Sequence, residues 1–259
     1  MPSNSAGASG SGRSGAIPKT WSRLDHERFG FGVAKLDDFR AETPAQALER
    51  LRADRVTLVI SRVDAADAPL VRALQQSGFE YMDSQLGYGM SARQAAALPQ
   101  EARTGAELGG AQDVDALCAI AAVVFEGFGH YFANPRLDRD RCREIYVDWT
   151  RRTLTDSEYA DKAFVYRHEG RAVALFCAKM AGAGEARYVR GGMGFVAPPF
   201  QREGVFKRLV SAAVCWAGEE GVGLDKNLVH STNYPVNAVF TRIGFKLTSH
   251  WMTFHRWLG

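Results

Sequence analysis

The sequence has no long apolar run, no cluster of cysteines and no strong excess of charge of one sign. No segment holds about 18 consecutive apolar residues, so we expect no membrane partner and no membrane-spanning helix. The net charge of +3 over 259 residues is too small to indicate a nucleic-acid partner by itself. Hydrophobic and charged contents of 46% and 24% instead predict a globular protein with a sizeable core.

The four cysteines are widely spaced, and the sequence contains no CxxC motif or Cys/His cluster. This spacing argues against a zinc site, so we expect no metal. We interpret the cysteines as packed, reduced thiols of a cytoplasmic protein. They are Cys118, Cys142, Cys177 and Cys215.

Two stretches have the composition of connecting segments. Residues 1–16 are rich in glycine, serine and alanine and lack the apolar segment of a signal peptide. Such a composition cannot bury a core, so we predict a disordered tail there. A polar stretch rich in alanine and glycine, roughly 91–112, predicts a connection between two halves of the chain.

Strands and helices alternate between these stretches. In the first half we expect a strand at 55–63, a helix at 67–79 and a strand at 80–90. In the second half we expect helices at 113–125, 141–154, 202–221 and 234–244, and strands at 163–168, 171–180, 186–197, 227–232 and 245–258. Both halves contain the order helix, Gly-Phe, alternating strand, which indicates an internal repeat within a mixed α/β sheet.

The segment VAPPFQREGVFKRLV, residues 196–210, ends a strand at two prolines and begins a helix after Gly204. A helix N-terminus carries unpaired N–H groups and partial positive charge, and a glycine lets an anion approach the backbone. Nearby Arg202, Lys207 and Arg208 add positive charge. These features suit a pyrophosphate, although a plain strand–loop–helix connection is the alternative.

This segment resembles the acetyl-CoA loop of the GNAT (Gcn5-related N-acetyltransferase) superfamily, V-x-P-x-x-[QR]-x-x-G-x-[GA]. A second segment, NYPVNAVFTRIGF at 233–245, resembles the later N-x-x-A-x-x-[YF]-x-x-x-G-F motif of that family. The resemblance implies a GNAT fold and acetyl-CoA as cosubstrate. Phe206 stands where the pattern has a small residue, and Asn233 also fits a plain helix cap. The implied acetyl-CoA contacts are Val196, Gln201, Arg202, Glu203, Gly204, Val205, Phe206 and Asn233.

The first half narrows the resemblance. TWSRLDHERFGFGVAKLD at 20–37 is similar to the opening of TDP-fucosamine acetyltransferases, as is FANPRLDRDRCREIYVDWTRRTL at 132–154. The similarity implies a tandem arrangement, with a truncated GNAT-like half-domain at 17–100 and a complete catalytic GNAT domain at 101–259. It also implies that the acetyl acceptor is the amine of a nucleotide-linked amino-deoxy sugar.

The resemblance further implies roles in catalysis. A backbone N–H of Phe195 or Val196 would hold the thioester carbonyl. The tyrosine that protonates the leaving thiolate in many relatives is replaced by Phe240, but a thiol with a reference pKa of about 8.5 is a tolerable leaving group near neutral pH. Tyr234 and Ser231 are nearby substitute acids or, alternatively, surface or capping residues.

The loop GFGHYFANPRL lies where the resemblance places the sugar nucleotide. It contains His130, Tyr131, Asn134 and Arg136 as candidate substrate-binding residues. His130 titrates in a range that suits a catalytic base, and Arg136 suits a pyrophosphate. An exposed loop histidine and a solvated arginine are the alternatives. Among the histidines on expected strands, His230 is the one that we would test.

Several interpretations stay open. Gly191, Gly192 and Gly194 fit close approach of a substrate, a β-bulge, or both. The acceptor could instead be an aminoglycoside, an amino acid or another small amine, and a non-catalytic acyl-CoA-binding protein is a further alternative. An intact Gln201-x-x-Gly204 argues against a carrier- or tRNA-dependent acyl transferase. The aromatic strand at 245–258 fits either a homodimer interface or a buried position.

Overall fold

The structure, a computed structural model, describes residues 20–39 and 42–259, so the tail predicted at 1–16 lies outside the described residues. The described chain forms one mixed nine-stranded sheet in the order β1-β2-β9-β3-β8-β7-β6-β5-β4, which confirms the predicted mixed α/β sheet. The strands are β1 (Val33–Lys35), β2 (Leu58–Asp64), β3 (Glu80–Met90), β4 (Ala106–Leu108), β5 (Lys162–His168), β6 (Arg171–Ala181), β7 (Tyr188–Val196), β8 (Gly223–His230) and β9 (Lys246–Trp257). The α-helices are α1 (Arg23–Phe29), α2 (Pro44–Ala53), α3 (Ala68–Gln76), α4 (Ala92–Ala96), α5 (Val114–Val124), α6 (Gly129–Ala133), α7 (Arg139–Thr155), α8 (Val205–Glu219) and α9 (Tyr234–Ile243).

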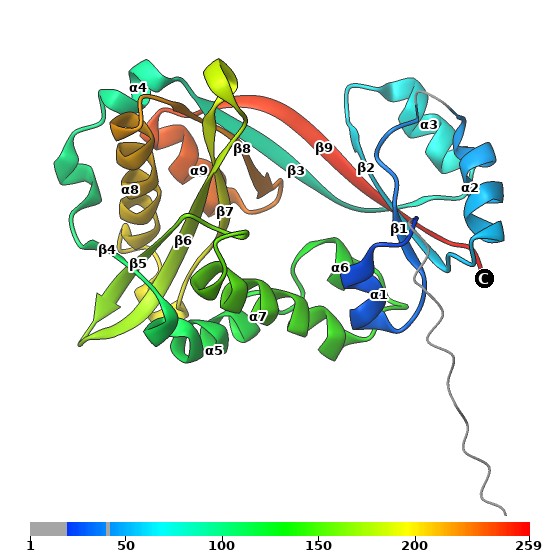
Figure 1. Cartoon of the computed structure of the whole chain (residues 1–259), viewed down its shortest axis with the longest axis horizontal. Helices are drawn as coiled ribbons and strands as arrows, with labels where there is room; N and C mark the ends of the chain where they lie inside the picture. The colour runs from blue at the N-terminus through cyan, green and yellow to red at the C-terminus, as the bar shows by residue number, and fades with distance from the viewer. Residues whose placement is uncertain (1–19, 40–41) are drawn as a thin grey trace, which may run out of the picture.

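The two halves of the chain exchange their last strands. β3, which ends the first half, lies between β8 and β9, whereas β9 lies between β2 and β3. Figure 1 shows these two long strands running together from one lobe of the molecule to the other. Over residues 251–255, β9 pairs with a strand of the chain on each side. β9 is therefore an internal strand, the second of the two interpretations of segment 245–258.

β7 and β8 begin as parallel neighbours and then separate. Their pairing covers Tyr188 and Val189 at the start of β7. The register of β7 against β6 then shifts between Phe176 and Ala178. This shift is a β-bulge, which bends a strand and increases its twist. The bulge turns the rest of β7 away from β8 and opens the sheet there.

A buried amide holds the strands at the point of separation. Asn227 of β8 accepts the backbone N–H of Gly191 through Oδ1 at 2.8 Å. Its Nδ2 donates to the backbone carbonyl of Tyr88 on β3 at 3.0 Å. Because both polar groups of the amide are satisfied, Asn227 can stay 2% exposed without an energetic penalty.

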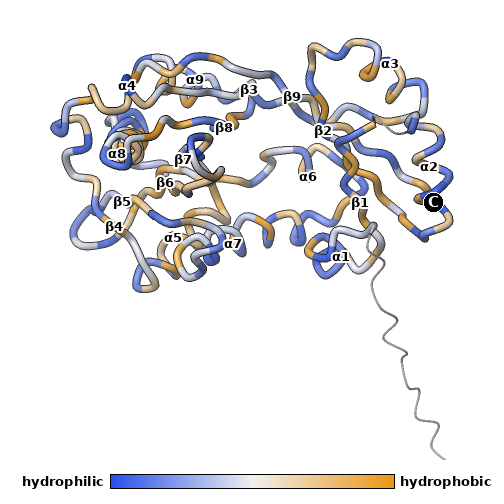
Figure 2. Tube along the Cα trace, turned by 45° about the horizontal axis from the view of Figure 1, so that its top comes forward, coloured by the Kyte–Doolittle hydropathy of each residue, from blue (hydrophilic) through white to orange (hydrophobic). Residues whose placement is uncertain are grey.

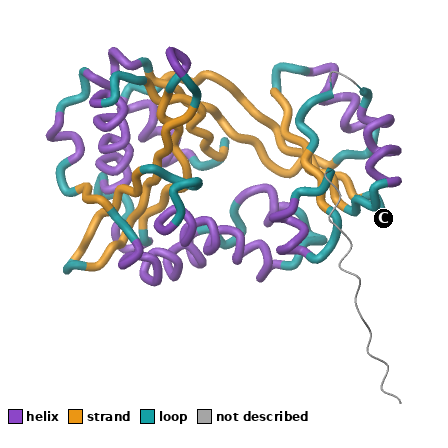
Figure 3. Tube along the Cα trace, in the orientation of Figure 1, coloured by secondary structure: helices purple, strands orange, loops and turns teal. Residues whose placement is uncertain are grey.

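Helices cover both faces of the sheet, as Figures 1 and 3 show. α8 is buried along most of its length and packs on β5, β6 and β7. Its small residues, such as Ala213 and Ala217, allow close contact with the strands. α5 and α7 pack on each other and contribute to the core on the opposite face. Figure 2 shows apolar residues concentrated along β6 and β2, in the two separate lobes.

Most of the predicted elements are present. β3 has the predicted bounds, and β5 and β6 form the predicted hairpin through Glu169 and Gly170, both with positive φ. Six elements lie in segments for which the pattern predicts no helix or strand: α1, β1, α2, α4, β4 and α6. Except for α1 and α2, these elements are only three to five residues long, too short for a periodic pattern.

All four cysteines are free and buried, which confirms the prediction of packed thiols. Among the described residues, no helix is both long and apolar enough to cross a membrane. The same residues contain no group of three or more His, Cys, Asp or Glu side chains that could hold a metal ion.

Candidate active site

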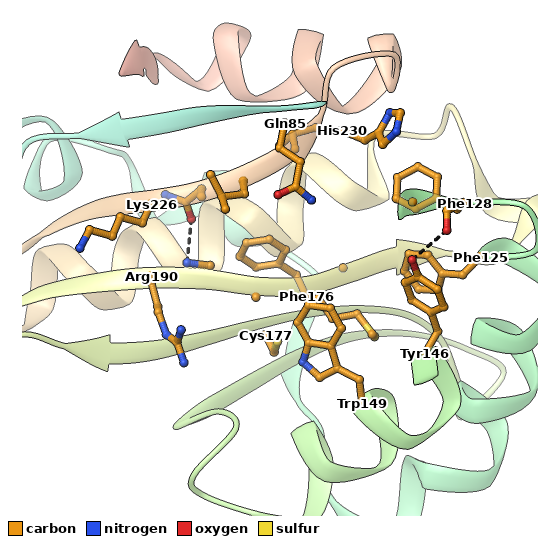
Figure 4. Close-up of a pocket in the computed structure, with 18 of the residues that line it drawn as sticks. Gln85, Phe125, Phe128, Tyr146, Trp149, Phe176, Cys177, Arg190, Lys226 and His230 are labelled. Atoms are coloured by element: carbon orange, nitrogen blue, oxygen red, sulfur yellow. Dashed lines mark hydrogen bonds between the residues drawn. The ribbon is translucent and has the colours of Figure 1, made fainter. Parts of the chain in front are cut away.

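A cleft of about 1000 Å³ opens where β7 and β8 separate, and it extends to β3, α6 and α7. Figure 4 shows Arg190 and Lys226 at one end and His230 and Phe128 at the other, with Trp149 between them. An elongated space with apolar walls and a few polar groups is typical of a small-molecule site. Its aromatic lining includes Phe125, Phe128, Tyr146, Trp149, Tyr159, Phe176, Phe206 and Phe240.

The predicted acetyl-CoA loop leads into α8 beside this cleft. Gly204 is the N-cap of α8, with φ of 75° and no side-chain cap. The first N–H groups of α8 therefore have no side-chain acceptor. Gln201 holds the loop to β7, because its Nε2 donates to the carbonyl of Val196 at 3.1 Å. Four successive residues of the loop are exposed: Gln201, Arg202, Glu203 and Gly204.

The first two residues of α8 turn inward. Val205 is buried in the core beneath the loop, and Phe206 lines the cleft. The ring of Phe206 meets that of Phe176 edge-on, with centroids 5.8 Å apart. A Cβ atom at Gly194 would lie 2.9 Å from the Phe206 ring. The glycine thus makes room for the large residue, whose bulk lies in the cleft and not over the loop.

The end of β7 presents a backbone donor on its open side. Ala197 donates to the carbonyl of Val173 on β6 at 2.9 Å. Because N–H directions alternate along a strand, the Phe195 N–H also points toward β6, whereas the Val196 N–H points to the side that β8 has left. The Val196 carbonyl, which Gln201 binds, lies on that same side. Of the two predicted oxyanion donors, Val196 has the suitable direction.

At the start of α9, two neighbouring residues that were predicted to belong to the site lie in different places. Asn233 lines the cleft and also caps the helix, since its Oδ1 accepts the N–H of Val236 at 3.3 Å. Tyr234 is 74% exposed and is not part of the cleft lining. Phe240 lines the cleft, is 2% exposed and packs on Tyr88, with centroids 5.3 Å apart. The structure therefore brings Asn233 and Phe240, but not Tyr234, to the site.

His230 and Asp83 meet at one end of the cleft. His230 Nδ1 accepts the backbone N–H of Thr232 at 3.3 Å, so a neutral His230 carries its proton on Nε2. This Nε2 lies 3.9 Å from Asp83 Oδ2. Asp83 is 2% exposed, and neither carboxylate oxygen has a hydrogen-bond partner in the described part of the chain. A buried carboxylate is costly without a partner, which indicates a place for a cationic group.

Gln85 extends this polar patch along β3. Its side chain projects into the cleft (Figure 4), and its Oε1 also has no partner among the described residues. Residues i and i+2 of a strand share a face, so Asp83 and Gln85 point the same way. Neither residue was predicted from the sequence, although the alternating polar positions within strand 80–90 were a signal. Which face of that strand meets a cleft depends on the strand exchange.

His130 lines the cleft above a second histidine. Its Nδ1 lies 2.9 Å from Nε2 of His255, and His255 Nδ1 lies 2.8 Å from Nδ2 of buried Asn134. Burial, and next the neighbouring His255, hold the pKa of His130 well below its ordinary value. Burial also lowers the pKa of His255 to about 4. Both rings are therefore neutral near pH 7, and one nitrogen of the predicted base is already bound.

The other two predicted substrate-binding residues differ in position. Tyr131 lines the cleft, but its hydroxyl donates to the buried carboxylate of Asp25 at 2.7 Å. Burial, and next the Asp25 carboxylate, raise the pKa of Tyr131 well above its ordinary value, so it stays protonated. Arg136 lies outside the cleft lining, with its guanidinium 4.2 Å from the Trp257 ring centroid. The structure thus brings Tyr131, but not Arg136, to the site.

The glycine-rich middle of β7 has both features that the sequence left open. Gly191, Gly192 and Gly194 line the cleft, and the β-bulge lies among them. A Cβ atom at Gly191 would collide with the Asn227 amide, and one at Gly192 with the Cys177 sulfur. The absence of side chains at these glycines therefore lets Asn227 and Cys177 pack against the strand. The glycine backbone itself faces the cleft.

Comparison with protein-family models agrees with this geometry. Residues 129–245 match the model of the acetyltransferase (GNAT) family. These residues form a GNAT domain. The domain contains β7, the uncapped start of α8 and the Asn233 helix, so both predicted motifs lie within it. A sequence search of curated proteins gave no match.

Solved structures support the fold. A tandem GNAT protein from the clavulanic acid biosynthesis pathway is 15% identical, with a TM-score of 0.58 over 89% of this chain and 76% of that one. A GCN5-related N-acetyltransferase from Kribbella flavida is 13% identical, with a TM-score of 0.53 over 86% and 80%. One from Sphaerobacter thermophilus is 16% identical, with a TM-score of 0.52 over 81% and 64%. The prediction of a tandem GNAT fold is confirmed.

Proposed function

We propose that this chain transfers an acetyl group from acetyl-CoA to an amine by direct attack in a ternary complex. One observation carries the proposal: the uncapped N-terminus of α8 at Gly204 and the outward N–H of Val196 are linked through Gln201, and each lies two residues from the cleft lining, at Phe206 and Gly194. The first suits a pyrophosphate, and the second suits a developing oxyanion. Both belong to the GNAT domain.

The acetyl donor would bind on the β7–β8 side of the cleft. The pyrophosphate of acetyl-CoA would accept N–H groups of the loop after Gln201 and of the first turn of α8, with Arg202 adding positive charge. The pantetheine arm would enter between the separated strands, past Phe206 and Asn233. The thioester carbonyl would accept the N–H of Val196. A donor of this kind lowers the barrier to acyl transfer by about 3–4 kcal/mol.

The amine would approach from β3. It must lose a proton before it attacks, and Asp83 offers a carboxylate that could hold the ammonium group and accept that proton. The amine nitrogen then bonds to the thioester carbon and loses its second proton to water, and the C–S bond breaks to release the thiolate of coenzyme A. The thiolate takes its proton from water, because its reference pKa of about 8.5 makes it a tolerable leaving group. Phe240 therefore does not prevent the reaction.

We further propose a nucleotide-linked amino-deoxy sugar as the acceptor. The similarity of the first half to TDP-fucosamine acetyltransferases supports this choice. So do three cationic residues that the first half contributes to the cleft, Arg28, Lys35 and Arg62. In this proposal, residues 17–100 form the truncated half-domain that faces the acceptor, and 101–259 bind acetyl-CoA. The free thiols fit a reducing compartment, so we place the reaction in the cytoplasm.

The direct test measures thiol release from acetyl-CoA with TDP- and UDP-linked amino sugars beside free amines. Release with a nucleotide sugar alone would support both parts of the proposal. Release with free amines alone would keep the acetyltransferase and reject the nucleotide sugar. Acetyl-CoA binding without release for any amine would favour a non-catalytic acyl-CoA-binding protein.

Two matched glycines test the acetyl-CoA loop. Gly204 and Gly221 have φ of 75° and 69°, and a Cβ atom at either would have no neighbour within 4 Å. Gly204→Asp places a carboxylate where we expect the pyrophosphate, and we predict roughly 100-fold weaker acetyl-CoA binding. Gly221→Asp introduces the same strain and charge beyond the other end of α8, and affinity should not change. Isothermal titration calorimetry measures both, and equal affinities would move the pyrophosphate away from this loop.

A further inference from the structure

A chain of hydrogen bonds under the cleft fixes the proton position of one histidine. It begins at Asn134, whose Oδ1 accepts the backbone N–H of Arg136 at 3.1 Å. The other amide atom, Nδ2, therefore faces Nδ1 of His255 at 2.8 Å. An amide nitrogen only donates, so His255 Nδ1 must accept. Neutral His255 consequently carries its proton on Nε2.

The same reasoning continues to the cleft. His255 Nε2–H donates to Nδ1 of His130 at 2.9 Å. A neutral imidazole has one donor and one acceptor, so His130 carries its proton on Nε2, on the ring edge away from His255. His130 lines the cleft. This series of hydrogen bonds therefore presents the Nε2–H group of His130 to a ligand in the cleft. A catalytic base would instead need a free lone pair on that nitrogen.

A guanidinium group lies on the same side of the cleft. Arg62 of β2 is opposite Thr253 of β9, which in turn is opposite Asp83 of β3. Residues directly opposite in neighbouring strands share a face, so the three side chains form a row. Arg62 Nε donates to Thr253 Oγ1 at 3.3 Å, which leaves its two terminal nitrogens for other acceptors.

Arg62 differs from the other two cations that the first half contributes. Lys35 pairs with the carboxylate of Asp25 at 2.8 Å, and Arg28 pairs with Asp148 at 2.8 Å. The carboxylate of Asp37 accepts only the backbone N–H of Arg62, and no carboxylate in the described residues pairs with its guanidinium group. Its charge also acts on His130, where together with Lys35 it disfavours the protonated ring. Arg62 is thus an unneutralised cation on the same side of the cleft as the neutral N–H donor of His130, and an anion would complement both.

We propose that Arg62 and His130 form a binding site for an anionic oxygen group of the acetyl acceptor, and that His255 and Asn134 position it by keeping the His130 proton on Nε2. Asp83 lies two strand spacings from Arg62, roughly 10 Å. The acceptor would therefore carry its anion and its amine about that far apart. This inference rests on the proposed function only in taking the cleft as the acceptor site.

The test observes His130 directly and needs no acetyl transfer. Long-range ¹H–¹⁵N correlation of the histidine rings reports the tautomer of each, and the His130→Gln variant identifies the His130 signals. Near pH 7 we expect His130 and His255 both neutral with the proton on Nε2. Inorganic pyrophosphate, added with excess coenzyme A present to occupy the other phosphate site, should shift His130 Nε2. A His130 protonated on Nδ1, or one that pyrophosphate leaves unchanged, would overturn the proposal.

Matched variants separate the site from general charge. Arg62→Gln should weaken pyrophosphate binding roughly 10- to 100-fold, the loss expected for a charged hydrogen-bonding partner. Arg72→Gln makes the same charge change on the exposed surface of α3 and should leave binding unchanged. Equal weakening in the two variants would mean that only net charge matters and would contradict the proposal.

A second pair of variants tests the positioning residues. His255→Gln keeps an acceptor for Asn134 and a donor for His130, so the His130 tautomer and pyrophosphate affinity should both be retained. His255→Met removes the donor, and a mixture of His130 tautomers with weaker binding should appear. A pure Nε2–H tautomer in His255→Met would show that His255 does not set it.

A second anion distinguishes the two sources of the ligand chemistry. Malonate provides carboxylates in place of phosphates and would be titrated under the same conditions. Tighter binding of pyrophosphate indicates a nucleotide-linked acceptor, and tighter binding of malonate indicates an amine that carries a carboxylate. Either supports an anion site, whereas binding of neither would overturn it. Failure of acetyl transfer would leave these results intact, so the two proposals fail separately.

Discussion

The described part of the chain contains two parallel strand–helix–strand units, β1-α2-β2 and β7-α8-β8, and their helices begin differently. In the first unit, Thr43 and Gln46 form a capping box, so side chains satisfy the start of α2. In the second unit, α8 begins at Gly204 with no side-chain cap. One helix closes its own N-terminus and the other leaves it open. The open helix start is what a pyrophosphate can use, and the first unit lacks it.

The helices that follow, α3 and α9, match more closely. Each begins with an Asp or Asn cap and a proline, contains a buried apolar residue, and ends with a left-handed glycine before a buried phenylalanine. The corresponding pairs are Asp67 and Asn233, Pro69 and Pro235, Leu74 and Phe240, Gly78 and Gly244, and Phe79 and Phe245. Leu74 shows that the position of Phe240 belongs to the core of both units. A phenylalanine at 240 satisfies the core requirement even without a hydroxyl group.

Replacing Leu74 and Phe240 tests the comparison of α3 with α9 and should have the largest effect. Leu74 and Phe240 are 0% and 2% exposed. We expect Leu74→Ala to lower the free energy of unfolding by about 2–5 kcal/mol and Phe240→Ala by about 3–5 kcal/mol, as measured by denaturant titration. Of the two residues, only Phe240 lines the cleft. We therefore expect only Phe240→Ala to lower the affinity of the folded protein for acetyl-CoA as well. An equal loss of acetyl-CoA affinity in both variants would show that Phe240 has no specific role in the cleft.

His255 lies on β9, the strand that the second half of the chain contributes to the first. We expect it to make the free energy of unfolding depend on pH, with an effect of intermediate size. Burial lowers its pKa to about 4, from about 6.5 in an unfolded chain. The unfolded state therefore binds this proton at higher pH. The associated stability is fully present above about pH 6.5 and falls by up to about 3 kcal/mol as the pH drops toward 4. Partly buried His130, whose pKa is also lowered, acts in the same direction.

Two histidine variants measure this effect by urea unfolding between pH 4 and 7. His255→Gln should give a flatter dependence of the unfolding free energy on pH than the unchanged chain. His168→Gln, at the exposed end of β5, should keep the original slope. An unchanged slope in His255→Gln would show that His255 is charged in the folded state, contrary to its buried environment.

The sequence predicts those helices and strands whose ends or periodicity are set by residues within the same segment. Proline and glycine mark the end of β7 and the start of α8, and alternation marks β3, so these elements were predictable. Asp83 and Arg62 were not, because no local pattern shows that β9 enters between their strands and places both on one cleft. Tyr234 shows the converse limit: it is next to the motif asparagine in sequence, yet at the first position of α9 it points to solvent.

The two Asx caps give the smallest and most specific test. Asp67 accepts the N–H of Leu70 at 3.0 Å, and Asn233 accepts that of Val236 at 3.3 Å. Replacing either by alanine should lower the free energy of unfolding by about 1 kcal/mol, the usual cost of a lost cap. Asn233 also lines the cleft and Asp67 does not. Asn233→Ala should therefore weaken acetyl-CoA binding several-fold, whereas Asp67→Ala should leave it unchanged. If calorimetry finds the same affinity in both variants, Asn233 is only a cap, as Asp67 is.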